Sequence, residues 1–132
     1  MSIFTPAEVA FLQSHRLGRL ATVNARGEPH VVPVRFRYDV ERDAIVVGGQ
    51  GMGTSKKYRD AAAGRPVAFV VDDRTPDGMP CGVEVRGTAE AHAADGDAIW
   101  PDADPQFLRL RPRRVVAWGI ETPPDQPNAR NV

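Results

Sequence analysis

The most constraining feature of the chain is a strict alternation of apolar and polar side chains over residues 32–39. A period of two is typical of a β-strand, in which successive side chains point to opposite faces. One face of this strand is therefore expected in a core, and the other toward a groove or solvent. The apolar members of the pattern are Val32, Val34, Phe36 and Tyr38.

Other short apolar or alternating segments predict a mainly β fold. A capping box, Thr5-Pro6-Ala7-Glu8, begins a short helix that ends near His15. A second helix is expected from about Gly53 to Ala63, and residues 93–105 have room for one irregular helical turn. Six or seven antiparallel strands with two or three short helices favour a small closed or nearly closed barrel. The predicted strands span residues 17–23, 30–38, 44–47, 67–71, 83–92, 107–110 and 113–120.

A barrel of this size has consequences for ligand binding. Such barrels fill their interior with side chains, so a sizeable ligand has to bind outside or at a subunit contact. The strand at residues 67–71 is apolar throughout and is expected to be covered on both faces. Gly87 interrupts a long alternating strand and is a predicted β-bulge.

Composition sets the domain organisation and excludes several partners. A chain of 132 residues predicts one domain, at residues 1–122, followed by a polar, proline-rich tail at 123–132 that is expected to be disordered. The 17 cationic and 17 anionic side chains give no overall field to attract nucleic acid or an anionic membrane. No apolar run is long enough to span a bilayer and no signal pattern is present. With Cys81 as the single cysteine, these features indicate a cytoplasmic protein.

The only two lysines of the chain, Lys56 and Lys57, lie together after the glycine-rich segment 48–53. They follow two hydroxyl side chains, Thr54 and Ser55, at the predicted start of a helix, where anions are favoured. One interpretation is a cradle for a phosphate group. The other is an exposed helix face on which two adjacent lysines are simply solvated.

The order of several segments resembles a known family. It is similar to the pyridoxamine 5'-phosphate oxidase-like split-barrel flavoproteins, and within them most similar to small actinobacterial F420-dependent oxidoreductases. The resemblance covers residues 4–120. The segments that carry it are Leu20–Val23, Gly27–Val34, Ser55–Lys57, Pro66–Asp73, Gly82–Glu90 and Arg113–Gly119.

The resemblance implies a six-to-seven-stranded antiparallel split β-barrel that forms a homodimer, with cofactor sites at the interface. In that family the strand matching residues 31–34 lies along the cofactor ring, and the segment matching residues 54–57 holds the cofactor phosphate. Lys57 is the stronger phosphate ligand of the two lysines, because Asp60 stands one turn beyond Lys56 and is able to pair with it. The implied cofactor-binding residues are Val31, Val32, Pro33, Val34, Thr54, Ser55, Lys56, Lys57 and Trp118.

The implied function is an F420-dependent oxidoreductase that transfers a hydride to a small conjugated substrate. No Ser-His-Asp set, no paired carboxylates and no metal-ligand spacing are visible in the sequence, so an enzyme of this kind would depend on a cofactor for its reactive centre. Two alternatives stay open at the same site: an FMN-dependent flavoprotein, and a non-catalytic flavin- or F420-binding protein. A third, from a different class, is an oligonucleotide-binding barrel.

Three features keep more than one interpretation each. His30 is a weak candidate for a proton donor to substrate, or a surface residue at a turn. Trp118 either stacks near the ring from a partner subunit or packs in the core. The arginine-rich segment 109–114 is a solvated strand face, a contact for the acidic tail of F420, or the surface of the oligonucleotide-binding alternative.

Overall fold

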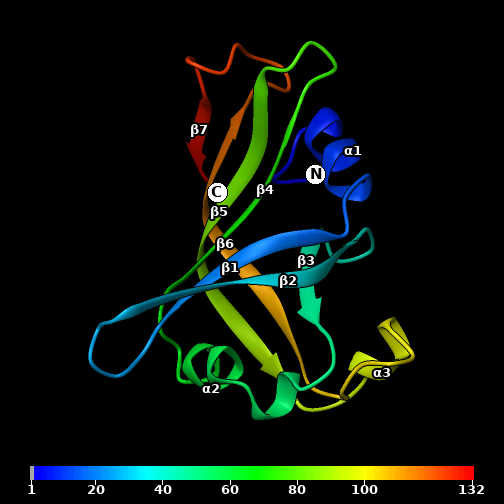
Figure 1. Ribbon diagram of the computed structural model, residues 1–132, viewed down its shortest axis with the longest axis vertical. Helices are drawn as coiled ribbons and strands as arrows, with labels where there is room; N and C mark the ends of the chain where they lie inside the picture. Colours follow the sequence, from blue (N-terminus) through cyan, green and yellow to red (C-terminus); the bar gives the residue numbers. More distant parts are fainter. Residues whose placement is uncertain (1) are drawn as a thin grey trace.

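Six antiparallel strands close into a barrel, and a seventh extends one edge (Figure 1). The computed structural model describes residues 2–132. The strand order is β3-β2-β1-β4-β5-β6-β7, and an additional pairing of β3 with β6 closes the barrel. The prediction of a mainly β, antiparallel barrel of six or seven strands is therefore confirmed. The strands are β1 Leu17–Val23, β2 Pro29–Asp39, β3 Ala44–Gly48, β4 Val67–Arg74, β5 Pro80–His92, β6 Phe107–Trp118 and β7 Asn128–Asn131.

Three short helices and one 3-10 turn connect or flank the strands of the barrel. The predicted capping box is present at the start of α1, where the Thr5 hydroxyl accepts from the Glu8 N–H and Glu8 Oε1 accepts from the Thr5 N–H. The expected second helix divides at Ser55 into a 3-10 turn and α2, because the Ser55 hydroxyl caps α2 by accepting from the Tyr58 N–H. The elements are α1 Pro6–Gln13, η1 Met52–Thr54, α2 Lys56–Ala62 and α3 Gly96–Ile99.

The alternating pattern of β2 places its side chains as predicted from Val34 onward, whereas Val32 is 38% exposed. Val34, Phe36 and Tyr38 are buried in the core, whereas Arg35 and Arg37 lie on the outer side of the barrel. Phe36 packs edge-on against Phe69 of β4 with ring centroids 5.2 Å apart. Since a register shift of one residue would exchange the two faces, the buried aromatic side chains fix which residues β2 presents outward.

Strand β6 is continuous where the sequence predicted two strands, at 107–110 and 113–120. Pro112, which stands between the two predicted strands, lies opposite Gly87 of β5, where the register shifts between Arg86 and Gly87. This irregularity is the predicted bulge. A proline has no N–H to donate to the ladder, and it is tolerated here because the bulge already interrupts the regular hydrogen bonding. A Cβ on Gly87 would lie 2.1 Å from the Arg111 carbonyl oxygen, so the two strands approach too closely there for a larger residue.

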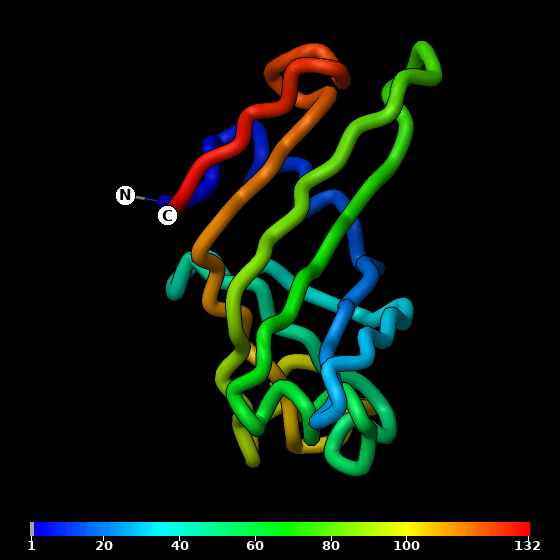
Figure 2. Tube along the Cα trace, turned by 90° about the vertical axis from the view of Figure 1, so that its left-hand side faces the viewer, coloured from blue at the N-terminus to red at the C-terminus, as the bar shows by residue number. Residues whose placement is uncertain are grey.

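The C-terminal tail was expected to be disordered, and the structure corrects this for residues 128–131. They form β7, which pairs with β6 from Ala117 to Arg114. The Arg130 guanidinium reaches the Glu8 carboxylate at 2.5 and 3.1 Å and donates to the Ile3 carbonyl at 2.8 Å. Figure 2 shows the red C-terminal strand beside the blue start of the chain. The polar, proline-rich composition of the tail did not predict this strand, because a specific ion pair between Arg130 and the buried Glu8 holds it in place.

Candidate cofactor site

A pocket of about 230 Å3 joins two segments that are distant in sequence. Strand β2 supplies Pro33, Val34 and Arg35, and α2 supplies Lys57. The remaining wall comes from Gly48–Gln50 and Met52. This space, called the cofactor pocket below, brings the predicted ring strand and the predicted phosphate segment together on one surface.

Lys57 faces the cofactor pocket, whereas Lys56 is exposed and does not line it. Burial lowers the pKa of the Lys57 ammonium, and burial is the only cause, since no carboxylate of the described residues opposes it. A desolvated cation without a partner gains more from an anionic ligand than a solvated one does. Of the two lysines, Lys57 is therefore the one placed to hold a phosphate.

The glycine-rich segment is held by a residue that sequence reasoning missed. The Asp104 carboxylate accepts from the N–H groups of Gly51 and Gly53, each at 3.1 Å, and the Asp104 N–H donates to the Gly49 carbonyl at 3.1 Å. The N–H groups of these two glycines are therefore engaged within the chain. Asp104 gives the loop its shape, and neither of these two N–H groups is left free for a ligand.

The two predicted hydroxyls have structural roles. Ser55 Oγ donates to the Met52 carbonyl at 2.7 Å while capping α2. Thr54 is exposed, and its hydroxyl is 3.4 Å from the Gly51 carbonyl. Both side chains are adjacent to the pocket wall without being part of its lining.

The predicted pairing of Asp60 with Lys56 does not occur. Its carboxylate Oδ1 lies 3.2 Å from Arg65 and 3.4 Å from Arg59, and the residue is 2% exposed. The other oxygen, Oδ2, is buried without a hydrogen-bond partner among the described residues. Because α2 turns Asp60 toward Arg65, its charge is offset by these arginines and does not neutralise Lys56.

The first half of β2 has one free edge. From Pro29 to Val34 the strand pairs only with β1, because the pairing with β3 begins at Arg35. The backbone along that edge is not taken by a neighbouring strand among residues 2–132. Val31 is 67% exposed and Val32 38%, so this half of the strand presents an apolar surface with open backbone groups.

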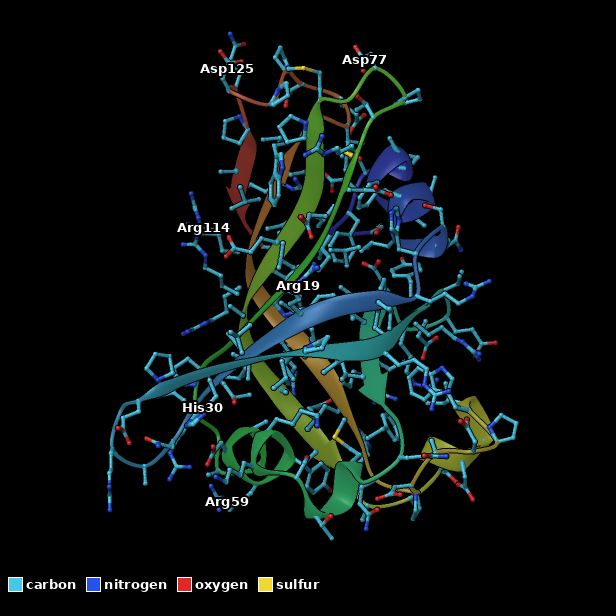
Figure 3. The ribbon with its side chains drawn as sticks, in the orientation of Figure 1. Arg19, His30, Arg59, Asp77, Arg114 and Asp125 are labelled. Carbon is cyan, nitrogen blue, oxygen red and sulfur yellow. The ribbon has the colours of Figure 1, made fainter. Side chains whose placement is uncertain are left out.

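The two remaining site predictions lie outside the cofactor pocket of a single chain. His30 is exposed on the hairpin between β1 and β2, with its Nε2 3.5 Å from Asn24 Nδ2 (Figure 3). Trp118 pairs with Gly82 at the far end of β6, and a Cβ on Gly82 would lie 2.5 Å from the indole ring. A role for Trp118 at the ring would require a second subunit.

The arginine-rich segment 109–114 is largely paired within the chain. Arg111 lies 2.7 Å and Arg109 3.7 Å from the Glu90 carboxylate, and Arg114 donates to Asn131 at 2.9 Å. This pairing offsets part of the charge that an oligonucleotide would need. Within residues 2–132 there is no group of three or more His, Cys, Asp or Glu side chains arranged to bind a metal. The same residues include no helix of the length and apolarity that a membrane crossing requires.

Comparison with known proteins identifies the family. The family model for pyridoxamine 5'-phosphate oxidase matches residues 4–130. The chain is 46% identical over 125 residues to 5a,11a-dehydrotetracycline/5a,11a-dehydrooxytetracycline reductase of Streptomyces rimosus, an alignment that covers 89% of this chain and 84% of the relative.

Solved structures share the fold. A candidate pyridoxamine 5'-phosphate oxidase from Lactobacillus delbrueckii is 26% identical with a TM-score of 0.64, covering 85% of this chain and 92% of that one. An FAD-binding protein from Mycobacterium smegmatis is 21% identical with a TM-score of 0.64, covering 87% and 94%. The prediction of an oxidoreductase is confirmed at the level of the family. The protein belongs to the pyridoxamine 5'-phosphate oxidase family.

Proposed function

We propose that the protein is an F420-dependent reductase that acts as a homodimer on a flat, conjugated small molecule. The observation that carries the proposal is the cofactor pocket, where the outer side of β2 and the unpaired Lys57 converge. The residues present fit a phosphate-bearing ring cofactor, because one wall is an apolar strand with open backbone groups and the other a desolvated ammonium.

The roles of the residues follow from their positions. Lys57 would bind the cofactor phosphate, and the stretch from Val31 to Val34 would lie along the ring and exclude water from it. When bound, a reduced deazaflavin supplies a hydride. The preference for F420 over FMN rests on the resemblance to small actinobacterial oxidoreductases, and FMN is the alternative that the experiment below distinguishes.

The substrate class is drawn from the Streptomyces rimosus relative. Its name describes the reduction of a 5a,11a-dehydro compound, that is, saturation of a carbon–carbon double bond within a four-ring skeleton. Because identity is 46% over most of both chains, we take a flat polycyclic enone as the substrate class of this protein. Its exposed β2 surface is apolar and suits a planar ligand.

An apolar outer surface supports the homodimer. Leu17 and Val31 are each 67% exposed, and the register places Ala21 between Val31 on one side and Ala68 on the other. Val70 of β4 extends this strip. Strand β4 was predicted to be covered on both faces, but in a single chain one of its faces is left uncovered. Light scattering should return twice 14.4 kDa, and a particle of 14.4 kDa at micromolar concentration would contradict the dimer.

Titration of the purified protein with F420 and with FMN, followed by absorbance, tests the cofactor. Lys57→Ala should weaken F420 about tenfold or more, since a hydrogen bond to a charged group contributes about 1.5–3 kcal/mol. Lys56→Ala is the matched control and should change the dissociation constant less than about twofold, because that side chain is solvated.

Each other outcome has a defined meaning. Tight FMN binding without F420 binding would overturn the deazaflavin assignment and leave the pocket in place. Binding of neither compound, or equal losses for both lysine variants, would show that the cofactor pocket does not hold a phosphate cofactor.

A further inference from the structure

A second pocket, of about 420 Å3, adjoins the cofactor pocket on the outer side of β2. It lies between the end of α1, the second half of β2 and Trp100, the residue that follows α3. Arg16, Arg35 and Arg37 line it, together with Trp100. We call it the arginine pocket.

The arginine pocket carries an excess of positive charge. Arg35 is paired with the Asp102 carboxylate at 3.0 and 3.3 Å, and Asp102 is itself 57% exposed. Neither Arg16 nor Arg37 has a carboxylate within 4.0 Å among the described residues. His15, also in the lining, is paired with Asp73 at 2.7 Å. One carboxylate thus faces three guanidinium groups in a chain whose net charge is zero, which concentrates a local positive field.

Trp100 positions two of these arginines. The guanidinium carbons of Arg35 and Arg37 lie 5.5 and 5.7 Å from the centroid of the Trp100 ring. The ring itself is 7% exposed and packs with Val46 and Phe107. Stacking on a fixed ring restrains the guanidinium planes, so less conformational entropy is lost when they bind a planar anion.

The two pockets form one continuous surface. Arg35 lines both, and the outward positions of β2 run from apolar Val31 and Pro33 to cationic Arg35 and Arg37. A substrate that lies beside a cofactor held in the cofactor pocket therefore meets the guanidinium groups of the adjoining arginine pocket.

We propose that the arginine pocket binds the anionic edge of the substrate, an ionised enol or a carboxylate on a flat polycyclic skeleton. The link to reduction rests on the proposed function, whereas anion binding by Arg16 and Arg37 stands independently of it. Guanidinium groups match paired oxygens of this kind through parallel N–H donors. The substrate class is thereby narrowed from flat enones to acidic flat enones.

The test is a calorimetric titration of the full chain with two three-ring probes, anthraquinone-2-carboxylate and its neutral carboxamide, without cofactor. The carboxylate should bind more tightly. Arg37→Gln should weaken the carboxylate about threefold and the Arg16→Gln/Arg37→Gln double variant about tenfold, while the carboxamide changes less than about twofold. Arg42→Gln removes the same charge outside both pockets, where Arg42 pairs with Asp39, and should leave both probes unchanged.

Three results would overturn the inference: equal affinities for the two probes, equal losses for Arg42→Gln and Arg37→Gln, or displacement of the carboxylate by saturating F420. The last would assign the pocket to the acidic tail of the cofactor. Thermal melts of each variant check that these substitutions, all at exposed residues, leave the fold intact. If the carboxylate binds in an arginine-dependent way but the protein binds neither F420 nor FMN, the proposed function is refuted and the anion-binding pocket is not.

Discussion

The ion pair between Glu8 of α1 and Arg130 of β7 provides a quantitative test of how the C-terminal tail is held. The Glu8 side chain is 1% exposed, and its carboxylate accepts two hydrogen bonds from Arg130 as well as the capping bond from the Thr5 N–H. Arg130→Met keeps much of the aliphatic stem and removes the guanidinium. A buried carboxylate then remains without its counter-ion.

The expected loss in the free energy of unfolding follows from how deeply Glu8 and Arg130 are each buried. Removing one partner of a fully buried ion pair costs about 3–5 kcal/mol. The Arg130 side chain is 25% exposed, so water reaches the vacated position and solvates Glu8 in part. The capping bond from Thr5 also remains. We therefore expect Arg130→Met to lower the free energy of unfolding by about 2–3 kcal/mol, a large part of the about 5–15 kcal/mol typical of a domain.

Urea unfolding and thermal melts measure this loss. A decrease of about 8–12 °C in Tm is expected for a chain of this size. The Glu8→Gln/Arg130→Met double variant should recover part of the loss, because no buried charge is left unpaired. Arg26→Met, on the exposed β1–β2 turn, is the control and should change stability by less than about 0.5 kcal/mol. A loss below that value for Arg130→Met would refute the argument that the pair holds β7.

Two more predictions concern acidic residues outside the ion pair. Burial acts to raise the pKa of Asp43, but hydrogen bonds from Ser2 and Tyr38 outweigh it and leave that pKa below its ordinary value. This contribution is present above about pH 4 and is lost as pH falls through the lowered pKa. Asp43→Asn should therefore cost about 1–2 kcal/mol in melts at pH 7, and progressively less in melts at pH values below about 4. Asp104→Ala leaves two glycine N–H groups without their acceptor, and should weaken F420 severalfold in the absorbance titration while lowering stability by about 1 kcal/mol.

The strands could be predicted because alternation reports burial directly. Leu17–Val23 has the predicted bounds, and residues 34, 36 and 38 point into the core as their apolar character required. The predictions of strand bounds were wrong where a contact between residues distant in sequence decides the structure and the local sequence pattern does not. Pro112 continues a strand because it faces the Gly87 bulge, and the polar tail folds because Arg130 finds Glu8.

The sequence named residues that the structure brings together, but not the residues that support them. Lys57 lines one pocket with Pro33 and Val34, and the assignment of these residues to a cofactor stays a prediction. Asp104 follows the glycines that it holds by about fifty residues, and Trp100 is separated by an even longer stretch of chain from the arginines that stack on it. Pairings of this range leave no periodic signal in a single sequence, because nothing in the local pattern specifies them.

The two faces of β2 have different roles: the inward side chains pack in the core, and the outward side chains form the proposed binding surface. Its inward residues Phe36 and Tyr38 are locked in the core, and a slip of one position would bury Arg35 and Arg37. The register that the core enforces therefore also sets the spacing of the outward groups. Since the outward side chains contribute little to the core, substitutions at Arg37 should leave the fold intact while they weaken the binding of the proposed anionic ligand.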